Sequence, residues 1–365
     1  MTGINLDRFR DPALAQRLVA KIAALATAPA ALMEVCGTHT MAISQYGIRG
    51  LLPQRVKLLS GPGCPVCVTS LGDIDRMIAI ARQPGVVLAT FGDMVRVPGS
   101  AGSLAAARAS GADVQVVYSA LDALEMAVAE PAKQVVFAGV GFETTSPTIA
   151  ATVVEARDRC ISNFSVYPAF KLVPPALGAI LGGGRVHIDG FLLPGHVSAI
   201  IGSRPYRFIA EQYKLPCVIA GFEPLDILES IALLLEQVQG KSEVGVRNEY
   251  ARSVPEDGNP DAMRILDQVF QPVDAMWRAI GIIPQSGLGF RPEYSRFDAS
   301  RLFDITVAPA PEPEGCRCGQ VMMGLIQPSQ CGHFGKTCTP SQPVGPCMVS
   351  SEGACAAWYK YGVTD

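Results

Sequence analysis

The sequence predicts the α/β class, with two similar parallel-sheet α/β domains, related by an internal duplication, and a small cysteine-rich domain after them. Three observations predict this fold. Short runs of β-branched residues alternate with helical patterns, which is typical of a parallel sheet. Matching motifs recur along the chain at one constant spacing. Finally, six of the eleven cysteines lie in the last fifty residues.

The composition limits the classes of protein to consider. With 365 residues, 49% of them hydrophobic and 17% charged, the chain can bury a large core in two or three domains. Its net charge of −3 and the lack of a basic tract exclude a nucleic-acid partner. The start, MTGINLDRFRDP, is charged where a signal peptide is apolar, and the most apolar expected helix, 227–238, is too short to span a bilayer. We therefore expect a cytoplasmic protein that does not bind membranes.

The expected elements follow one another in a regular order. A helical lead occupies residues 1–30, with its helix over 12–27. The eight expected strands form two sets of four: 32–36, 56–60, 86–90 and 114–119, then 134–139, 164–168, 190–193 and 217–220. These sets predict a first α/β domain over residues 31–130 and a second over residues 131–240.

The two sets of strands resemble copies of one unit. An offset of 104 positions relates three pairs of motifs: Gly37-x-x-Thr40 and Gly141-x-x-Thr144, Leu121-Asp122 and Leu225-Asp226, and Thr90 and Pro194. A constant offset predicts two units of the same topology. The same offset pairs Cys36 with Val140, and the second unit has no counterpart of Cys64 and Cys67. The first unit should therefore carry the thiol chemistry, and the second should supply a facing wall.

The last third of the chain changes character. We expect residues 241–310 to be a packing segment and linker, irregular and helical over 249–298 and proline-rich in APAPEPEG at 308–315. Residues 311–365 then form the cysteine-rich domain. Its spacing, C-x-C-x12-C-x6-C-x8-C-x7-C, contains no C-x-x-C pair of the kind that zinc ribbons use. This irregular spacing favours an iron–sulfur cluster, which takes four cysteines, over zinc or disulfides.

A C-x-x-C pair, Cys64 and Cys67, stands directly before an expected helix over 71–83, with Ser70 as N-cap and Asp73 as its capping-box partner. Thiols near a helix N-terminus are stabilised as thiolates. Such a pair can cycle between dithiol and disulfide, or hold a soft metal.

Cys36 ends an expected strand in MEVCGTHT, and His39 follows three residues later. A strand-end cysteine followed by glycine is expected to face a cleft. His39 could bond the thiolate, donate a proton or bind a metal. Alternatively, Cys36 is an ordinary buried cysteine, like Cys160 and Cys217. Zinc also remains open, since Cys36 and His39 together with the C-x-x-C pair could supply four ligands.

Several long motifs together resemble the HypD family of [NiFe]-hydrogenase maturation proteins, along almost the whole chain. They are MEVCGTHT, GPGCPVC, GFETTSPT, PGHVSAIIG, GFEPLDIL and CTPSQPVGPCMVSSEGACAAWYKYG. The resemblance implies a scaffold for assembling the iron–dicyano–carbonyl unit of the hydrogenase active site. It also implies a small HypC-type partner, a HypE-type cyanide donor and, through HypC, the hydrogenase large subunit. The family carries a 4Fe–4S cluster in a C-terminal domain beneath two similar α/β domains.

The resemblance also implies roles for individual residues. Cys36 would bind the iron together with a cysteine of the HypC-type partner, and Cys64 and Cys67 would be a redox thiol pair. His39 could donate a hydrogen bond to bound cyanide or to the Cys36 thiolate. The implied cluster ligands come from Cys318, Cys331, Cys338, Cys347 and Cys355, with Cys316 the weakest match.

Such a protein is an assembly scaffold with redox activity rather than a conventional turnover enzyme. Two alternatives belong to other classes. One is a cluster-dependent disulfide reductase that uses Cys64 and Cys67, and the other is a zinc-stabilised binding module without redox activity.

Overall fold

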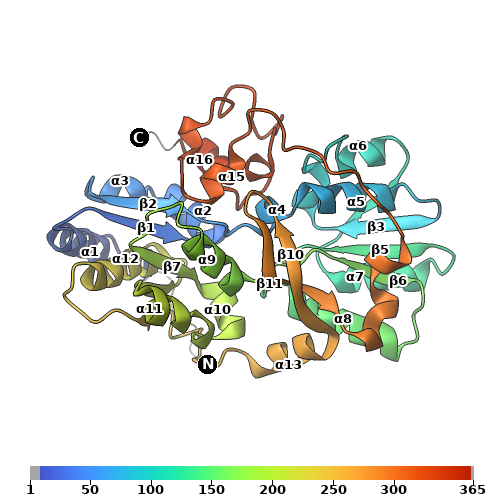
Figure 1. The fold of residues 1–365 in the computed structure, drawn as a ribbon, viewed down its shortest axis with the longest axis horizontal. Coiled ribbons are helices and arrows are strands. Elements are labelled where there is room, and N and C mark those ends of the chain that lie inside the picture. Colours follow the sequence, from blue (N-terminus) through green and yellow to red (C-terminus); the bar gives the residue numbers. More distant parts are fainter. Residues whose placement is uncertain (1–8, 363–365) are drawn as a thin grey trace.

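The structure, a computed structural model, describes residues 9–362. Two parallel sheets lie side by side, a long hairpin stands between them, and the cysteine-rich tail covers the junction from one side (Figure 1). The first eight residues of the expected lead, and residues 363–365, lie outside the described residues. The α/β class, with two parallel-sheet domains and a cysteine-rich C-terminal region, is confirmed.

The first sheet is five-stranded and entirely parallel, in the order β2-β1-β7-β8-β9. Its strands are β1 (Ala30–Glu34), β2 (Val56–Ser60), β7 (Gly190–Pro194), β8 (Cys217–Ala220) and β9 (Val246–Asn248). Helices α1 (Pro12–Leu25) and α12 (Pro224–Val238) pack together against one face. The carboxyl ends of β1, β7 and β8 therefore share one edge, where an open α/β sheet gathers its functional residues.

The second sheet is four-stranded and parallel, in the order β4-β3-β5-β6. Its strands are β3 (Val86–Thr90), β4 (Asp113–Val116), β5 (Gln134–Gly139) and β6 (Phe164–Pro168). Helices α5 (Leu71–Ala81) and α6 (Leu104–Ala109) cover one face, and α7 (Ala120–Ala129) and α8 (Ser146–Asp158) cover the other. Since both faces are buried, β3 is apolar at nearly every position rather than alternating.

The expected division into domains over 31–130 and 131–240 does not match the sheets. Strands β1 and β2 pair with β7 and β8 from the second half, whereas β3 and β4 pair with β5 and β6. The two sheets have the same order once β1 is matched with β5, β2 with β6, β3 with β7 and β4 with β8. Each repeat unit therefore gives two strands to each sheet. Neighbouring strands in sequence often pair in space, and here this tendency fails between β2 and β3.

Equivalent helices of the two units both begin with a capping box. In α7, Ser119 and Asp122 form a capping box, and in α12, Glu223 and Asp226 form one at positions 104 residues later. Strands β3 and β7, and likewise β4 and β8, are offset by the same 104 residues. The two units thus have the same topology, as the sequence predicts.

A long antiparallel hairpin fills the space between the sheets and was not expected from the sequence. It consists of β10 (Phe270–Trp277) and β11 (Gly281–Phe290) and follows α13 (Pro260–Val269). The expectation of irregular and helical packing over 249–298 is wrong for these residues. Pro272 and Pro284 make these segments difficult to predict as strands from the sequence, because proline is normally confined to edge positions of a sheet.

The cysteine-rich tail packs onto the first repeat unit. Its helices are α15 (Cys318–Met322) and α16 (Ala354–Tyr361), with short 3-10 turns η5 (Pro328–Gln330) and η6 (Pro346–Met348). Helix α16 contacts α2 (Gly37–Gln45), and η6 contacts α4 (Pro65–Val68). The tail therefore lies against both cysteine motifs of that unit.

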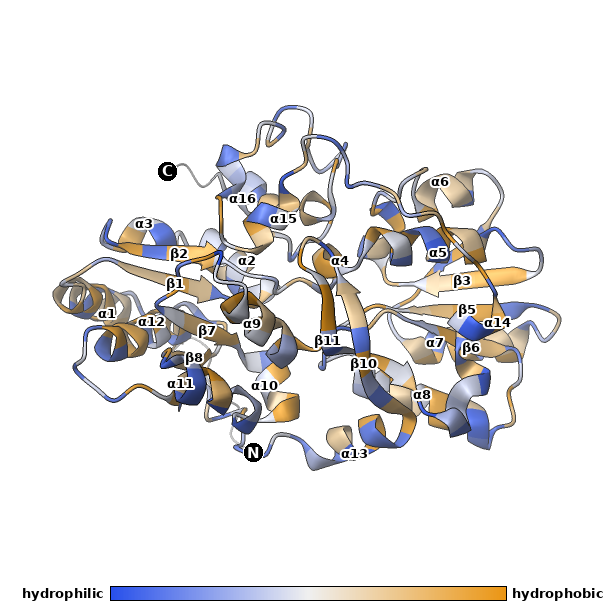
Figure 2. Cartoon of the chain, viewed as in Figure 1, coloured by the Kyte–Doolittle hydropathy of each residue, from blue (hydrophilic) through white to orange (hydrophobic). Residues whose placement is uncertain are grey.

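Short elements complete the fold. They are α3 (Ile48–Leu51), η2 (Gly92–Arg96), α9 (Val173–Gly182), α10 (Gly195–Ile201), η3 (Arg204–Tyr206), α11 (Arg207–Tyr213), η4 (Pro292–Phe297) and α14 (Ala299–Leu302). The hydrophobic residues concentrate in the strands and on the inner faces of the helices (Figure 2). No helix in residues 9–362 is long and apolar enough to cross a membrane.

Candidate functional site

Cys36 stands at the carboxyl edge of the first sheet, between β1 and the first turn of α2. Its side chain is only 8% exposed. The backbone N–H groups of Thr38 and His39 face the sulfur, but burial outweighs them and raises the pKa of Cys36 to about 12. The thiol is therefore neutral near pH 7, and a bound soft cation would be needed to hold it as thiolate.

Close backbone contact joins the Cys36 loop to the GPGC motif. The N–H of Gly37 donates to the carbonyl of Gly63 over 2.8 Å. A Cβ atom on Gly63 would collide with the backbone of Cys36, so this position requires glycine. Because Cys64 follows directly, the contact brings the second cysteine motif alongside the first.

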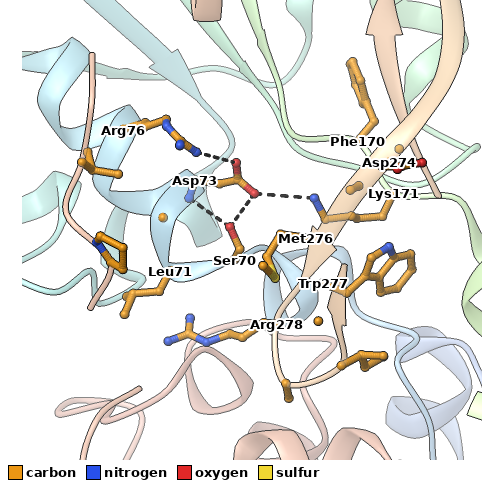
Figure 3. A pocket seen from close by; sticks show the side chains of 18 of the residues that line it. Ser70, Leu71, Asp73, Arg76, Phe170, Lys171, Asp274, Met276, Trp277 and Arg278 are labelled. Carbon is orange, nitrogen blue, oxygen red and sulfur yellow. Dashed lines mark hydrogen bonds and ion pairs between the residues drawn. The ribbon is translucent and has the colours of Figure 1, made fainter. Parts of the chain in front are cut away.

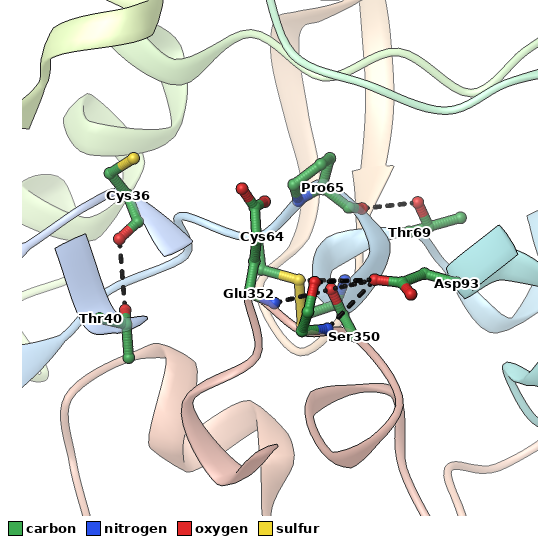
Figure 4. Close-up of a disulfide and its surroundings, with 10 residues drawn as sticks. Cys36, Thr40, Cys64, Pro65, Thr69, Asp93, Ser350 and Glu352 are labelled. Atoms are coloured by element: carbon green, nitrogen blue, oxygen red, sulfur yellow. Dashed lines mark hydrogen bonds between the residues drawn. A yellow bond between two sulfur atoms is a disulfide. The ribbon is translucent and has the colours of Figure 1, made fainter. Parts of the chain in front are cut away.

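Cys64 and Cys67 form a disulfide in this structure (Figure 4). The pair belongs to its own short helix α4, where Cys64 is the N-cap and its sulfur accepts from the N–H of Cys67 over 3.1 Å. Helix α5 follows with Ser70 as its N-cap, as expected, and ends at Ala81, two residues early. The two sulfurs are thus within bonding reach, as a dithiol–disulfide couple requires.

The His39 ring is turned away from Cys36. It is fully buried, and its Nε2 lies 3.0 Å from the carbonyl oxygen of Gly221 and 3.2 Å from that of Ala220. Since carbonyl oxygens only accept, Nε2 carries the hydrogen, and Nδ1 has no hydrogen-bond partner among the described residues. Burial lowers the pKa of His39 to about 4, so the ring is neutral. It is the backbone N–H of His39, rather than the ring, that faces the Cys36 sulfur.

This placement bears on two sequence-based hypotheses. The ring N–H of His39 is already engaged, so the ring does not stand ready to donate to the Cys36 thiolate or to a ligand beside it. The four residues considered for zinc do not converge, because Cys64 and Cys67 bond each other while the ring stacks on Phe222 at 4.8 Å.

A buried acid lies beneath Cys36. Glu34 ends β1 and is completely buried, and the Thr40 hydroxyl donates to its Oε1 over 2.7 Å. Burial raises the pKa of Glu34 to about 7 despite the Arg49 guanidinium, whose Nη2 lies 3.9 Å from Oε1. Arg49 also stacks over the Trp358 ring at 5.2 Å, so this polar cluster ties β1 to the tail.

The loop between Cys347 and Cys355 forms hydrogen bonds on both sides of the Cys64–Cys67 disulfide, with Thr38 on one side and Asp93 on the other. The Thr38 hydroxyl donates to Glu352 Oε1 over 3.1 Å, and Asp93 Oδ2 accepts from the Ser350 hydroxyl and the Ser351 N–H, each over 3.1 Å. Burial raises the pKa of Glu352. Asp93 belongs to η2 of the other sheet, so the tail bridges the two domains here (Figure 4). Glu352 and Asp93 carry no local signal in the sequence, and only these long-range contacts reveal them.

Five of the six tail thiols lie close enough to interact. They are Cys316, Cys318, Cys338, Cys347 and Cys355. A Cβ atom on Gly345 would lie 2.6 Å from the sulfurs of both Cys316 and Cys318. Hydrogen bonds with Cys318 and Cys347 lower the pKa of the buried Cys355, whereas hydrogen bonds with Cys318 and Cys355 raise the pKa of Cys347.

The converging set differs from the expected one. It also contains Cys316, the weakest match, and Cys331 lies half-buried on the turn after η5. Buried thiols with mainly one another as partners fit a group that takes four thiolates. No set of three or more His, Cys, Asp or Glu within residues 9–362 is arranged to hold a single metal ion. A cluster differs in this respect, because its thiolates bind different iron atoms.

The same edge of the second sheet is closed by packing. Val140, the counterpart of Cys36, is 3% exposed, and Phe142 stacks on Trp277 of the hairpin at 6.1 Å. Glu143, the counterpart of His39, is buried and accepts from the Val173 N–H over 2.9 Å. Burial raises the pKa of Glu143 to about 7.

The facing wall at the Cys36 edge comes from β7 and β8. His196, from the PGHVSAIIG motif, stacks on Phe222 at 3.9 Å, on the ring that also meets His39. Of the two cysteines expected to be ordinary and buried, Cys217 is buried. Cys160 is exposed, so that expectation is wrong for it, because the chain turns there with φ +56° after α8.

Comparison with known proteins gives a consistent result. The family model HypD, described as "Hydrogenase formation hypA family", matches residues 13–362. The hydrogenase maturation factor HypD of Rhodobacter capsulatus is 47% identical over 369 residues, covering 98% of this chain and 97% of the relative. Those of Cupriavidus necator and Escherichia coli K12 are 45% and 44% identical, with the same coverage of both chains.

Proposed function

The chain belongs to the HypD family of hydrogenase maturation proteins, and from this premise we propose that it is the scaffold on which the iron–dicyano–carbonyl unit of the [NiFe] site is assembled. Its proposed partners are a HypC-type small protein, a HypE-type cyanide donor and, through HypC, the hydrogenase large subunit. The iron is cargo, and the proposed compartment is the cytoplasm, where thiols stay reduced.

One observation carries the proposal: the tail contacts both cysteine motifs of the first unit. Helix α16, which carries Cys355, packs on the helix that follows Cys36, and η6, which carries Cys347, packs on the helix of the Cys64–Cys67 pair. Three groups of cysteines that lie far apart in sequence thus form one continuous region. A scaffold that holds a metal and supplies electrons needs such an arrangement.

Cys36 is the proposed iron ligand. Low-spin Fe(II) carrying cyanide and CO suits a soft thiolate. The N–H groups of Thr38 and His39 would stabilise the thiolate once the metal displaces the proton. A single protein thiolate leaves the other coordination positions free, and a cysteine of the HypC-type partner can take one of them. The iron can then leave with that partner, whereas four ligands from this chain would retain it.

Cys64 and Cys67 are the proposed electron source. Oxidation of the dithiol to the disulfide releases two electrons and two protons. Four of the six tail cysteines would hold a 4Fe–4S cluster, which supplies one-electron transfer when bound. The Asp93 and Glu352 contacts would keep the tail seated on the disulfide during this exchange.

A second candidate function is that of a cluster-dependent disulfide reductase, which the Cys64–Cys67 disulfide beside the tail also favours. Infrared spectra of the protein isolated with its HypC-type partner separate the two functions. We expect bands of iron-bound cyanide and CO. Disulfide reduction without those bands would favour the reductase, and stoichiometric zinc without acid-labile sulfide would favour a zinc-stabilised module.

A further inference from the structure

A cavity of about 740 Å³ has no cysteine in its lining and borders the tail, where Ala279 of its wall approaches Gly319. The first turns of α5, the loop after β6, the hairpin β10–β11 and the linker over 307–312 form its walls (Figure 3). Its volume falls within the range of about 300–1,000 Å³ typical of small-molecule sites. Neither the proposed iron site nor the thiol relay uses it.

Two buried cations line this cavity. Lys171 is 3% exposed, and the only partner described for its ammonium is Asp73 Oδ2 at 3.6 Å, beyond a normal hydrogen-bond length. The Arg278 side chain is 2% exposed and donates from Nε and Nη2 to Glu312 over 2.8 and 2.6 Å. Its Nη1 has no hydrogen-bond partner among the described residues. Leaving such donors unpaired in a buried site is costly.

The carboxylates of the cavity, in contrast, have partners. Asp73 accepts from the Ser70 and Tyr167 hydroxyls over 2.8 and 2.9 Å. Glu312 holds Arg278, and Asp274 accepts from the N–H of Gln285 over 3.0 Å. The groups that remain available to a ligand are therefore hydrogen-bond donors. The formal charges of the lining residues nevertheless sum to zero. Remaining donors select a ligand that accepts hydrogen bonds.

The start of α5 adds further donors. Ser70 caps the N–H of Asp73, whereas the N–H groups of the first two helical positions have no partner within a helix. At the second of these positions, Gly72 lines the cavity, and a Cβ atom there would meet no atom closer than 3.9 Å. A ligand can therefore approach this backbone, where the positive end of the helix dipole favours an anion.

We propose that this cavity binds a small organic anion, with a phosphate or carboxylate group beside Lys171 and the start of α5. Arg76, whose Nη1 lies 3.9 Å from Asp73, stands at the same end of the cavity. The apolar body of the ligand packs against Phe170, Met276 and Leu288. The ligand accepts from the Lys171 ammonium and from the first backbone N–H groups of α5, without displacing the existing ion pairs.

Titration calorimetry of the full chain with phenyl phosphate, benzoate and phenol tests the proposal. At least one anion should bind at a single saturable site, at least tenfold more tightly than phenol, which corresponds to about 1.4 kcal/mol. The tighter of the two anions identifies the head group. The proposal is overturned if neither anion binds saturably, or if phenol binds as tightly as both anions.

Matched variants locate the binding site. Gly72→Phe should fill the cavity and abolish anion binding, whereas Gly72→Ala should retain it. Lys171→Met should weaken binding at least tenfold, whereas Lys133→Met, on a separate surface, should leave it unchanged. Thermal unfolding verifies that each variant folds, and if Lys171→Met does not fold, the Gly72 pair decides. Unchanged binding in Gly72→Phe contradicts the proposed site.

Discussion

The carboxyl edges behind β1 and β5 occupy the same position in the two repeat units but carry different chemistry. Behind β1 stand Cys36 and His39, and behind β5 stand Val140 and Glu143. The backbone is repeated, whereas the reactive side chain is present in one copy only. The two units share one topology and present equivalent edges, and only the edge behind β1 has a thiol at this position.

The two edges are also covered differently. The tail covers the first with a hydrogen bond from Thr38 to Glu352 and with apolar packing of Met348 and Val349 in the same core cluster. The hairpin covers the second through stacking of Trp277 on Phe142. Opening the second edge would expose the large aromatic surface of Phe142 and Trp277. An edge closed in this way is suited to support, and the edge with the thiol is the one proposed as the site.

The largest expected effect concerns the tail, which covers the Cys36 edge and not the equivalent edge behind β5. Cys347→Ala should lose nearly all of the roughly four irons per chain that a 4Fe–4S cluster contributes, and the tail should unfold with it. Cys160→Ala is the control and should retain the iron, since Cys160 is exposed after α8, outside the tail. Iron and sulfide analysis of anaerobically purified protein measures this. Equal loss in both variants would contradict the ligand set.

The second prediction concerns the disulfide, which has no counterpart behind β5. Cys64→Ser should abolish the Cys64–Cys67 disulfide and leave the tail iron intact, because neither residue is among the converging tail thiols. Mass spectrometry after alkylation of oxidised protein should show one newly reactive thiol. Loss of the iron in Cys64→Ser would show that the pair belongs to the cluster instead.

The third prediction concerns His39 and Glu143, which occupy equivalent positions in the two units. Burial shifts their pKa values in opposite directions. The pKa of His39 falls to about 4, so stability declines as pH falls from about 6.5, where the unfolded chain protonates first. The pKa of Glu143 rises to about 7, so stability declines as pH rises from about 4.5, where the unfolded chain ionises first. Each change is worth at most about 3 kcal/mol.

Denaturant unfolding at several pH values separates these two contributions. Because the two contributions oppose each other between about pH 4.5 and 6.5, Glu143→Gln should make stability rise more steeply with pH in that window. His39→Gln should do the reverse, with some loss of packing on Phe222. An unchanged pH profile in Glu143→Gln would mean that this carboxyl is not protonated in the folded protein.

The smallest expected effect concerns Asp93, which anchors the tail from the other sheet. Asp93→Asn should weaken the bonds from Ser350 and Ser351 by about 1 kcal/mol and speed amide exchange in residues 350–353 roughly fivefold. Asp75→Asn is the control, because Asp75 accepts from Ser100 and not from the tail. Equal exchange rates in both variants would show that the tail is held elsewhere.

Much of this comparison could be predicted from the sequence. The offset of 104 residues relates elements that have the same topology, and local signals such as the Ser119–Asp122 capping box set where helices begin. The strand-end position of Cys36 also follows from local pattern, since a buried strand and a following Gly37 are both visible in the sequence.

The predictions that failed concern features that depend on contacts between distant segments. No local signal states that β2 and β3 belong to different sheets. The His39 ring turns toward Gly221, 182 positions away, although its spacing from Cys36 suggested a contact. Likewise, Cys316 is the weakest match in the sequence, and only the fold of the tail shows it beside the other thiols.

The central claim is that iron acquires its cyanide and CO ligands while it is bound to Cys36, which lies at the one edge that carries a thiol. Infrared spectroscopy of the protein isolated with its HypC-type partner tests it most directly, in Cys36→Ala and in Val140→Cys. Cys36→Ala should keep the fold, the tail iron and partner binding but lose the cyanide and CO bands, and Val140→Cys combined with it should not restore them. Bands at full strength in Cys36→Ala would contradict the account and move the iron to Cys64 and Cys67.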